Sequence, residues 1–201
     1  MKARVAVLVS GSGTNLQALI DAEAAGKLPD AQLDLVISDR SSAYALHRAE
    51  QAGIATAVLS SRRTAAAQSS FDEQLLAALA EIDLVVLAGY LTIVPEKVVR
   101  QFAGRIINIH PSLIPAFCGE GWCGLRVHEG VLNRGMKITG ATVHEVTDEV
   151  DGGQILAQKA VAVQAGDTPE TLQRRVMEEA EWQILPAVTQ QLANQIVEGA
   201  R

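Results

Sequence analysis

Cysteine is scarce in this chain, which has only Cys118 and Cys123 among its 201 residues. Two cysteines are too few for a disulfide framework or a cysteine-based metal site, so a reducing compartment is expected. Long apolar runs are also missing, because none approaches the roughly 20 residues that a membrane span needs. The first residues show no signal-peptide pattern. We therefore expect a cytoplasmic protein that does not enter a membrane.

Basic charge is low as well. The formal net charge is −6 and no basic tract occurs, so nucleic-acid binding has little electrostatic support. A small anionic ligand is not excluded, because phosphate sites are local and built largely from backbone groups. Arg62 and Arg63, in the polar segment 60–70, could meet such an anion, although a solvated pair is the alternative. The composition, 48% hydrophobic and 20% charged, is typical of a globular domain.

Short apolar strands alternate with helical patterns along the first half of the chain. This alternation, with short connections, predicts a doubly wound, mostly parallel α/β sheet. After Pro115 the pattern changes to two longer strands that look like an antiparallel extension, followed by helices that Pro186 is expected to interrupt. The expected strands are 5–9, 33–37, 54–59, 83–88, 105–110, 137–146 and 155–163, and the expected helices begin at 16, 42, 71, 96, 126 and 168.

The turn Ser10-Gly-Ser-Gly-Thr-Asn15 lies between the first strand and the first helix. Its glycines let backbone N–H groups approach an anion, and the helix N-terminus adds positive potential. Thr14 and Asn15 suit a helix cap. The turn is a candidate phosphate cradle, and a plain strand-to-helix connection is the alternative. A dinucleotide site is disfavoured because Leu16 replaces the third glycine of that fingerprint, although Asp39 follows the second strand.

Asn108 and His110 share one face of the strand that Pro111 ends, because side chains alternate with period two along a strand. In an open parallel sheet, ligands bind at the carboxyl ends of the strands. There, an amide can donate to a developing oxyanion and an imidazole can donate or relay a proton. The alternative is that both residues cap the strand end and bond only to backbone.

Asp151 lies in the polar loop Thr147–Gly153, just before two glycines that allow a close approach. An aspartate near an imidazole favours its protonated form and fixes its orientation. Asn108, His110 and Asp151 would together suit acyl transfer to an amine without a covalent intermediate; a turn carboxylate is the alternative for Asp151. Nucleophilic catalysis is not expected, since G-x-S-x-G is absent and Cys118 has no activating lysine nearby.

Four segments resemble the folate-dependent formyltransferases, and among them the glycinamide ribonucleotide formyltransferase family of purine biosynthesis. The resemblance covers essentially the whole chain. The block Asn-x-His-Pro-Ser-Leu-x-Pro is common to the formyl transferases and hydrolases that use folate. The early glycine turn and the length narrow the resemblance to the glycinamide ribonucleotide formyltransferases. The segments are Ser10–Asn15, Asn108-Ile-His-Pro-Ser-Leu-Ile-Pro115, Thr142-Val-His144 and Asp148-Glu-Val-Asp-Gly-Gly153.

The resemblance implies a Rossmann-like formyltransferase fold and formyl transfer from 10-formyltetrahydrofolate, a co-substrate, to the amine of glycinamide ribonucleotide, without a metal. It implies one domain over 1–201, with a phosphate-binding half (1–103) and a catalytic and folate-binding half (104–201), acting as a monomer or homodimer. The implied catalytic residues are Asn108, His110 and Asp151, supported by His144. The implied ribonucleotide-binding residues are Gly11, Ser12, Gly13, Thr14, Asn15, Glu178 and Glu181. The implied folate-binding residues are Gln68, Leu91, Thr92, Ile93, Val94, Asn108, Thr147, Asp148, Glu149, Val150 and Asp151.

The chain departs from the family pattern at three places. Gln68 or a neighbour stands where an arginine is common. The segment 175–186 is one residue longer, so Glu178 or Glu179 could take the place of Glu181, and Trp182 stands where a histidine often follows. The glycine-rich stretch 117–124 extends a loop that is often shorter. Two other functions stay open: a hydrolase that releases formate with the same three residues, and a non-catalytic nucleotide-binding module.

Overall fold

Residues 1–60 and 65–200 are described by the computed structural model, except for the side chains of 65–67. Arg62 and Arg63, the pair considered for an anion, lie outside the described residues. Seven strands form a mixed sheet in the order β3-β2-β1-β4-β5-β6-β7, which confirms the predicted α/β class. The chain divides into two compact units: Met1–Ile106 with Thr189–Arg201, and Ile107–Val188.

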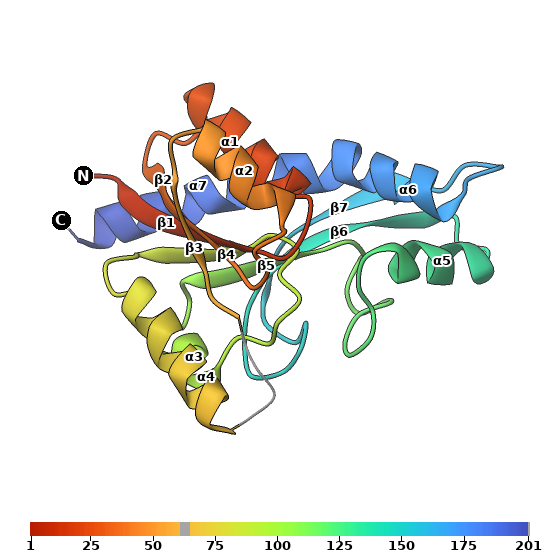
Figure 1. Ribbon diagram of the computed structural model, residues 1–201. Coiled ribbons are helices and arrows are strands. Elements are labelled where there is room, and N and C mark those ends of the chain that lie inside the picture. The colour runs from red at the N-terminus through yellow and green to blue at the C-terminus, as the bar shows by residue number, and fades with distance from the viewer. Residues whose placement is uncertain (61–64, 201) are drawn as a thin grey trace. The chain divides into compact units, whose positions relative to one another are not determined.

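The first unit holds a parallel part of the sheet. Its strands pair in parallel, β1 with both β2 and β4, and β2 with β3. Helices α1 and α2 lie on one face of these strands, and α3 and α4 on the other (Figure 1). The bounds are β1 Ala3–Val9, α1 Thr14–Ala24, β2 Ala31–Ser38, α2 Tyr44–Gln51, β3 Ala55–Val58, α3 Ala65–Ala78, β4 Leu84–Leu87 and α4 Glu96–Gln101.

Strand β1 is fully buried from Val5 to Val9, as expected for a central strand covered on both faces. Each covering helix contributes an apolar stripe, such as Leu16 and Leu19 on α1. Helix α3 begins at Ala65 rather than at Phe71, so residues 65–70, in a segment expected to be a surface loop or a frayed helix start, are helical. Consecutive alanines favour a helix.

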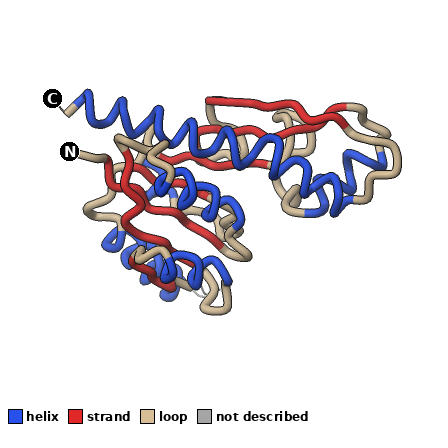
Figure 2. Tube along the Cα trace, turned by 90° about the horizontal axis from the view of Figure 1, so that it is seen from above, coloured by secondary structure: helices blue, strands red, loops and turns tan. Residues whose placement is uncertain are grey.

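The second unit holds the antiparallel part of the sheet, as predicted. β6 pairs antiparallel with both β5 and β7, and β6 and β7 run side by side as a long pair (Figure 2). Helix α6 packs against α5, and the π-helix η1 packs against β7. The bounds are β5 Ile106–His110, α5 Leu125–Asn133, β6 Ile138–Glu145, β7 Ile155–Ala162, α6 Pro169–Val176, η1 Met177–Glu181 and α7 Trp182–Gly199.

The interruption predicted at Pro186 was wrong. Pro186 lies inside α7, and the irregular turn is η1, which precedes α7. A π-helical turn accommodates one extra residue in a helix. Pro186 follows this turn as the fifth residue of α7 and gives up one backbone N–H donor there.

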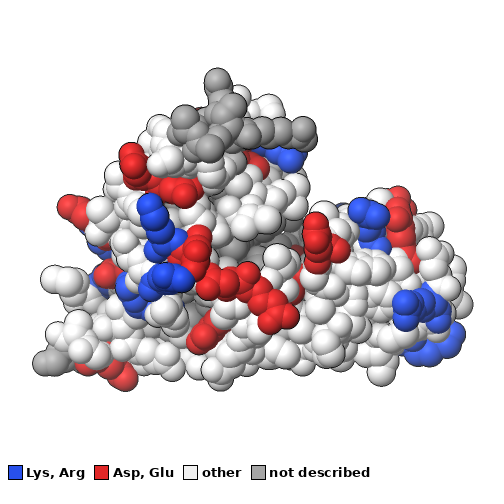
Figure 3. Space-filling view, turned by 90° about the horizontal axis from the view of Figure 1, so that it is seen from below, with Lys and Arg blue, Asp and Glu red and all other residues white. Residues whose placement is uncertain are grey.

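Among the described residues, no helix is long and apolar enough to cross a membrane. On the face shown in Figure 3, lysine and arginine side chains gather only in small groups that lie beside acidic ones. This distribution agrees with the net charge of −6 and gives no support on that face to a nucleic-acid interface.

Candidate active site

Strand β5 delivers Asn108 and His110 as the sequence predicts. The intervening side chains Ile107 and Ile109 are buried in the core, so the alternate positions are directed to the other face of the strand. Across the antiparallel pair, Asn108 lies opposite His144 and His110 lies opposite Thr142. Directly opposed residues are in side-chain contact range, and both of these pairs build the site.

Asn108 is held by His144. Their side chains meet with 3.1 Å between Nδ2 of the amide and Nε2 of the imidazole. Nδ1 of His144 lies 2.7 Å from the Glu145 carbonyl, which can only accept, so Nδ1 carries a hydrogen. In the neutral ring Nε2 is then the acceptor for the Asn108 amide. His144 therefore fixes the amide so that its second N–H remains for a ligand.

His110 is oriented by a main-chain carbonyl and a carboxylate. Its Nε2 lies 2.9 Å from the Phe117 oxygen, and its Nδ1 lies 3.6 Å from Oδ2 of Asp151. Because the carbonyl can only accept a hydrogen bond, Nε2 carries a hydrogen in either charge state. Nδ1 is then the nitrogen that gains and loses the proton, and it faces the carboxylate.

Asp151 joins both histidines. Its Oδ1 lies 3.5 Å from Nε2 of His144, and its Oδ2 accepts from the Gly119 amide at 2.8 Å. Burial raises the pKa of the carboxyl, but the adjacent His144 side chain, the charge of His110 and the Gly119 amide together hold it below its ordinary value. The structure thus keeps Asp151 charged and ready to balance a protonated imidazole.

The backbone at Asp151 is unusual. Asp151 has φ of 57°, a left-handed conformation that is uncommon outside glycine and that clusters at functional positions. A side chain at Gly153 would place Cβ 1.9 Å from the Glu145 carbonyl oxygen, so only glycine fits there. The close approach predicted from the two glycines was that of Asp151 to the imidazole, and Oδ2 of Asp151 lies 3.6 Å from Nδ1 of His110.

The segment that follows His110 is anchored on β6 by Thr142. The Thr142 hydroxyl donates to the Ser112 carbonyl at 2.7 Å and accepts from the Ile114 amide at 3.1 Å. Gln158 of β7 donates to the same hydroxyl and to the Ile114 carbonyl. These bonds fix the chain just beyond the imidazole, and Ile114–Pro115 is a cis peptide.

His128 lies near His110 and is fully buried. Neither of its ring nitrogens has a hydrogen-bond partner among the described residues. Burial first, and then the charge of His110, lower its pKa from 6.5 to about 4. The ring therefore stays neutral near pH 7.

The predicted phosphate turn lies in the first unit. α1 begins at Thr14 with Gly13 as its N-cap, so the expectation that Thr14 and Asn15 cap the helix was wrong; they occupy its first turn. Gly13 has φ of 72°, and a Cβ there would lie 2.6 Å from Cβ of Ala45. Arg48 donates to the Ser12 carbonyl at 2.8 Å. The turn is thus held by α2 as well as by its own helix.

The segment 91–94 adjoins this turn, since the Ser10 hydroxyl accepts from the Leu91 amide at 2.8 Å. Leu91 and Ile93 are 55% and 78% exposed, which is unusual for large apolar side chains. Asp39 accepts from the Thr92 hydroxyl at 2.9 Å, so a structural contact accounts for the acid that had suggested a ribose site. Tyr90 is close by, and burial followed by the charge of Asp39 raises the pKa of its hydroxyl.

The remaining predicted residues differ in burial. Gln68 lies on α3 and donates to Asp72 at 2.8 Å. Glu178 is exposed and pairs with Arg174 at 3.1 Å, whereas Glu181, at the end of the π-helix, is buried. The four residues 147–150 are exposed, including Val150 at 51%.

Sequence reasoning missed the main-chain groups that orient His110 and Asp151. The Phe117 carbonyl and the Gly119 amide carry no signal in residue type; the only indication is the glycine-rich composition of their loop. It also missed His128, which lies in the helix expected from residue 126. By contrast, the grouping of Asn108, His110, His144 and Asp151 was correctly anticipated.

The site combines an amide, an imidazole and a carboxylate on an α/β fold. An amide can stabilise an oxyanion, and an imidazole beside a carboxylate can move a proton, so the protein belongs to the class that can do both. The pattern of the formyl transferase family matches residues 3–189, and the chain belongs to this family. The resemblance found in the sequence is thereby confirmed.

The curated relatives include both longer multifunctional proteins and a protein of similar length. Human trifunctional purine biosynthetic protein adenosine-3 is 44% identical over 98% of this chain, which spans only 19% of that protein's length. Bovine and chicken proteins of the same name are similar, with 18% and 19% covered. Phosphoribosylglycinamide formyltransferase of Haemophilus influenzae is 42% identical over 92% of this chain and 84% of its own.

Two solved structures have a similar fold. Glycinamide ribonucleotide transformylase 1 from Symbiobacterium toebii superposes with a TM-score of 0.87 at 41% identity, over 96% of this chain and 89% of its own. A formyltetrahydrofolate deformylase from Pseudomonas syringae superposes with 0.78 at 29% identity, over 93% of this chain and 61% of its own.

Proposed function

We propose that the protein transfers the formyl group of 10-formyltetrahydrofolate to the amine of glycinamide ribonucleotide, giving formylglycinamide ribonucleotide and tetrahydrofolate in purine biosynthesis. The observation that carries the proposal is the cluster of Asn108, His110 and Asp151, in which each side chain has its own orienting partner. The name of the H. influenzae relative, at 42% identity, supports this choice of reaction.

The chemistry is direct attack by the amine. Its nitrogen bonds to the formyl carbon, and the formyl oxygen becomes a tetrahedral oxyanion. The second N–H of Asn108 and the Nδ1–H of protonated His110 donate to that oxygen. Asp151 balances the imidazolium and takes part in moving the proton from the attacking nitrogen to N10 of the folate, which leaves as its bond to the formyl carbon breaks.

The ribonucleotide phosphate is assigned to the turn 11–15. The left-handed Gly13 and the N-terminus of α1 present backbone N–H groups to a single phosphate. The assigned residues are Gly11, Ser12, Gly13, Thr14 and Asn15. For the ribose and glycinamide part we favour Glu181 over Glu178 and Glu179, because only Glu181 is buried.

The folate-binding residues are assigned in each unit separately. Leu91 and Ile93 in the first unit, and Val150 in the second, are large apolar side chains that the fold leaves exposed, the kind of group that an apolar ligand covers. Thr92, Val94, Thr147, Asp148 and Glu149 complete this assignment. Gln68 or a neighbour stands where the family commonly has an arginine, and we assign Gln68 to the folate.

The two halves of the chain are assigned different tasks. We assign phosphate binding to the half 1–103 and catalysis with folate binding to the half 104–201 of a single domain. The protein acts in the cytoplasm on small molecules, as a monomer or homodimer, with His144 supporting Asn108 and no metal in the reaction.

A hydrolase is the second candidate, favoured by the likeness to the P. syringae deformylase. Water would then replace the amine, and a ribonucleotide phosphate site would have no purpose. Titration calorimetry with glycinamide ribonucleotide separates the two functions. We expect Asn15→Ala to weaken binding about tenfold or more, the value of one charge-assisted hydrogen bond, while Asn133→Ala, an exposed control, binds as wild type. Failure of the wild-type protein to bind the ribonucleotide would favour the hydrolase.

A further inference from the structure

The loop 116–124 contacts both catalytic side chains through its main chain. The Phe117 carbonyl accepts from Nε2 of His110 at 2.9 Å, and the Gly119 amide donates to Oδ2 of Asp151 at 2.8 Å. The position of this loop therefore sets the orientation of the imidazole and of the carboxylate together. Phe117 has φ of 51°, which is costly for a bulky residue, so contacts around the loop must hold it there.

Aromatic rings supply those contacts. The chain has only two Trp, two Tyr and three Phe residues, and this loop contains Phe117 and Trp122. Their ring centroids are 5.3 Å apart with planes at 77°, the edge-to-face arrangement that aromatic pairs favour. The Arg134 guanidinium lies 5.6 Å from the Phe117 ring, where a cation adds attraction.

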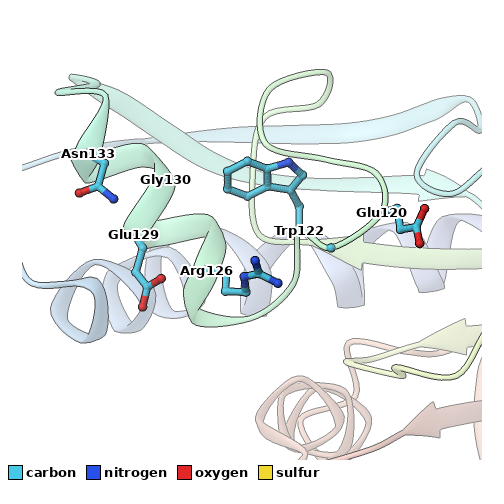
Figure 4. A pocket seen from close by; sticks show the side chains of 7 residues that line it. Glu120, Trp122, Arg126, Glu129, Gly130 and Asn133 are labelled. Atoms are coloured by element: carbon cyan, nitrogen blue, oxygen red, sulfur yellow. The ribbon is translucent and has the colours of Figure 1, made fainter.

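The Trp122 and Phe117 rings pack against Gly130 of α5. A Cβ at this position would lie 2.5 Å from Cζ3 and 2.8 Å from Cη2 of Trp122, and 3.0 Å from Cδ1 of Phe117. Figure 4 shows the Trp122 ring reaching toward α5 near Gly130. Glycine disfavours a helix interior relative to alanine, and the two rings account for its presence.

Trp122 and Gly130 also line a cavity of about 370 Å³. Its charged lining is Glu120, Glu129 and Arg126, a mixture that selects neither an anion nor a cation. The packing of Trp122 on Gly130 is therefore better explained by what it does for the loop than by a ligand in this cavity.

We propose that Trp122 and Gly130 are positioning residues: their contact holds the Phe117 carbonyl on Nε2 of His110 and the Gly119 amide on Asp151, and so fixes which imidazole nitrogen faces the carboxylate. The effect on catalysis rests on the formyl transfer proposed above. The effect on the imidazole does not, because it exists in the protein without substrate.

The direct test is ¹⁵N NMR of histidine-labelled protein without ligands, near pH 8. In the wild type we expect neutral His110, assigned with His110→Gln, to carry its hydrogen on Nε2. Gly130→Ala forces the Trp122 ring away, so we expect a mixture of the two tautomers. Gly199→Ala is the matched control, because a Cβ at that glycine meets no atom within 4 Å and should leave the spectrum unchanged.

The second test is a double-mutant cycle. We expect Gly130→Ala and Trp122→Ala each to lower kcat by about ten- to a hundredfold, the scale of a small misplacement of a catalytic group, with little change in either KM. The double variant should be no slower than Trp122→Ala, since the added methyl no longer meets a ring. Trp122→Phe should recover part of the rate.

Two results would overturn the proposal. One is an unchanged His110 tautomer in Gly130→Ala and Trp122→Ala proteins that unfold cooperatively at wild-type temperatures. The other is full additivity of the two substitutions in kcat. If instead the tautomer shifts as expected and no variant or wild type transfers formyl groups, the positioning proposal holds and the proposed function fails.

Discussion

Asn108 and His144 face each other across the β5–β6 pair, and their side chains are joined by a hydrogen bond of 3.1 Å. The same histidine is tied to the Glu145 carbonyl at 2.7 Å and lies 3.5 Å from Asp151. The Asn108 amide is thus oriented by a group that also lies beside the Asp151 carboxylate, so the amide and the acid are positioned as a unit.

Asn108→Asp tests the amide as a donor, because it keeps the size of the side chain and removes both N–H groups. We expect kcat for formyl transfer to fall by about 10²–10³, the range for loss of one oxyanion donor, while KM for both substrates changes little. Steady-state kinetics with each substrate varied measures this. A loss confined to KM would instead make Asn108 a ground-state binding residue.

Asp151→Asn tests the carboxylate. The folded pKa of Asp151 lies below the ordinary value of 3.8, so the unfolded chain binds the proton first as the pH falls. Asp151 therefore stabilises the fold above about pH 4, and this contribution is lost as the pH falls through the folded pKa. Urea unfolding from pH 6 to 3 should show a shallower acid loss for Asp151→Asn than for wild type, with Asp148→Asn, an exposed neighbour, as control. Equal slopes for wild type and Asp151→Asn would contradict the assignment.

His128 affects stability at higher pH than Asp151 does. Its pKa falls from 6.5 to about 4 on folding, so between these values the unfolded chain binds a proton that the folded chain does not. Stability should decrease as the pH falls across this range, by at most about 3 kcal/mol. His128→Leu should remove most of that slope, and substitution of the exposed His47 by Gln should retain it. A steep slope that survives in His128→Leu would place the cause elsewhere.

The sequence predicted the strands better than the ends of the helices. Buried strands are apolar runs with clear boundaries, such as the one that Pro111 ends after His110, and their alternation predicts the sheet. The start of α3 was predicted too late although its alanines favour a helix. The effect of Pro186 was mispredicted because local composition does not reveal the π-helical turn that precedes α7.

The site could be predicted as far as it is made of side chains. Asn108, His110 and Asp151 are recognisable by residue type and spacing, and His144 by the resemblance to the family. The Phe117 carbonyl and the Gly119 amide are backbone groups that every residue has, and only the folded loop places them on His110 and Asp151.

Gly13→Ala tests the phosphate turn. Its φ of 72° is strained for alanine, and its Cβ would meet Ala45 at 2.6 Å, whereas Gly26 has φ of 70° and open space. We expect Gly26→Ala to cost about 1–2 kcal/mol from the backbone alone, and Gly13→Ala to cost more and to raise KM for the ribonucleotide. Chemical denaturation and kinetics of the pair measure both. Equal stabilities would show that α2 yields to the new methyl.

The destination of the formyl carbon distinguishes a formyltransferase from a hydrolase. 10-Formyltetrahydrofolate labelled with ¹³C in the formyl group is incubated with the protein, with and without glycinamide ribonucleotide, and the labelled products are followed by NMR. The account predicts labelled formylglycinamide ribonucleotide only when the acceptor is present, and loss of that product in His110→Ala. Labelled formate formed at a comparable rate without the acceptor would contradict it and identify a hydrolase.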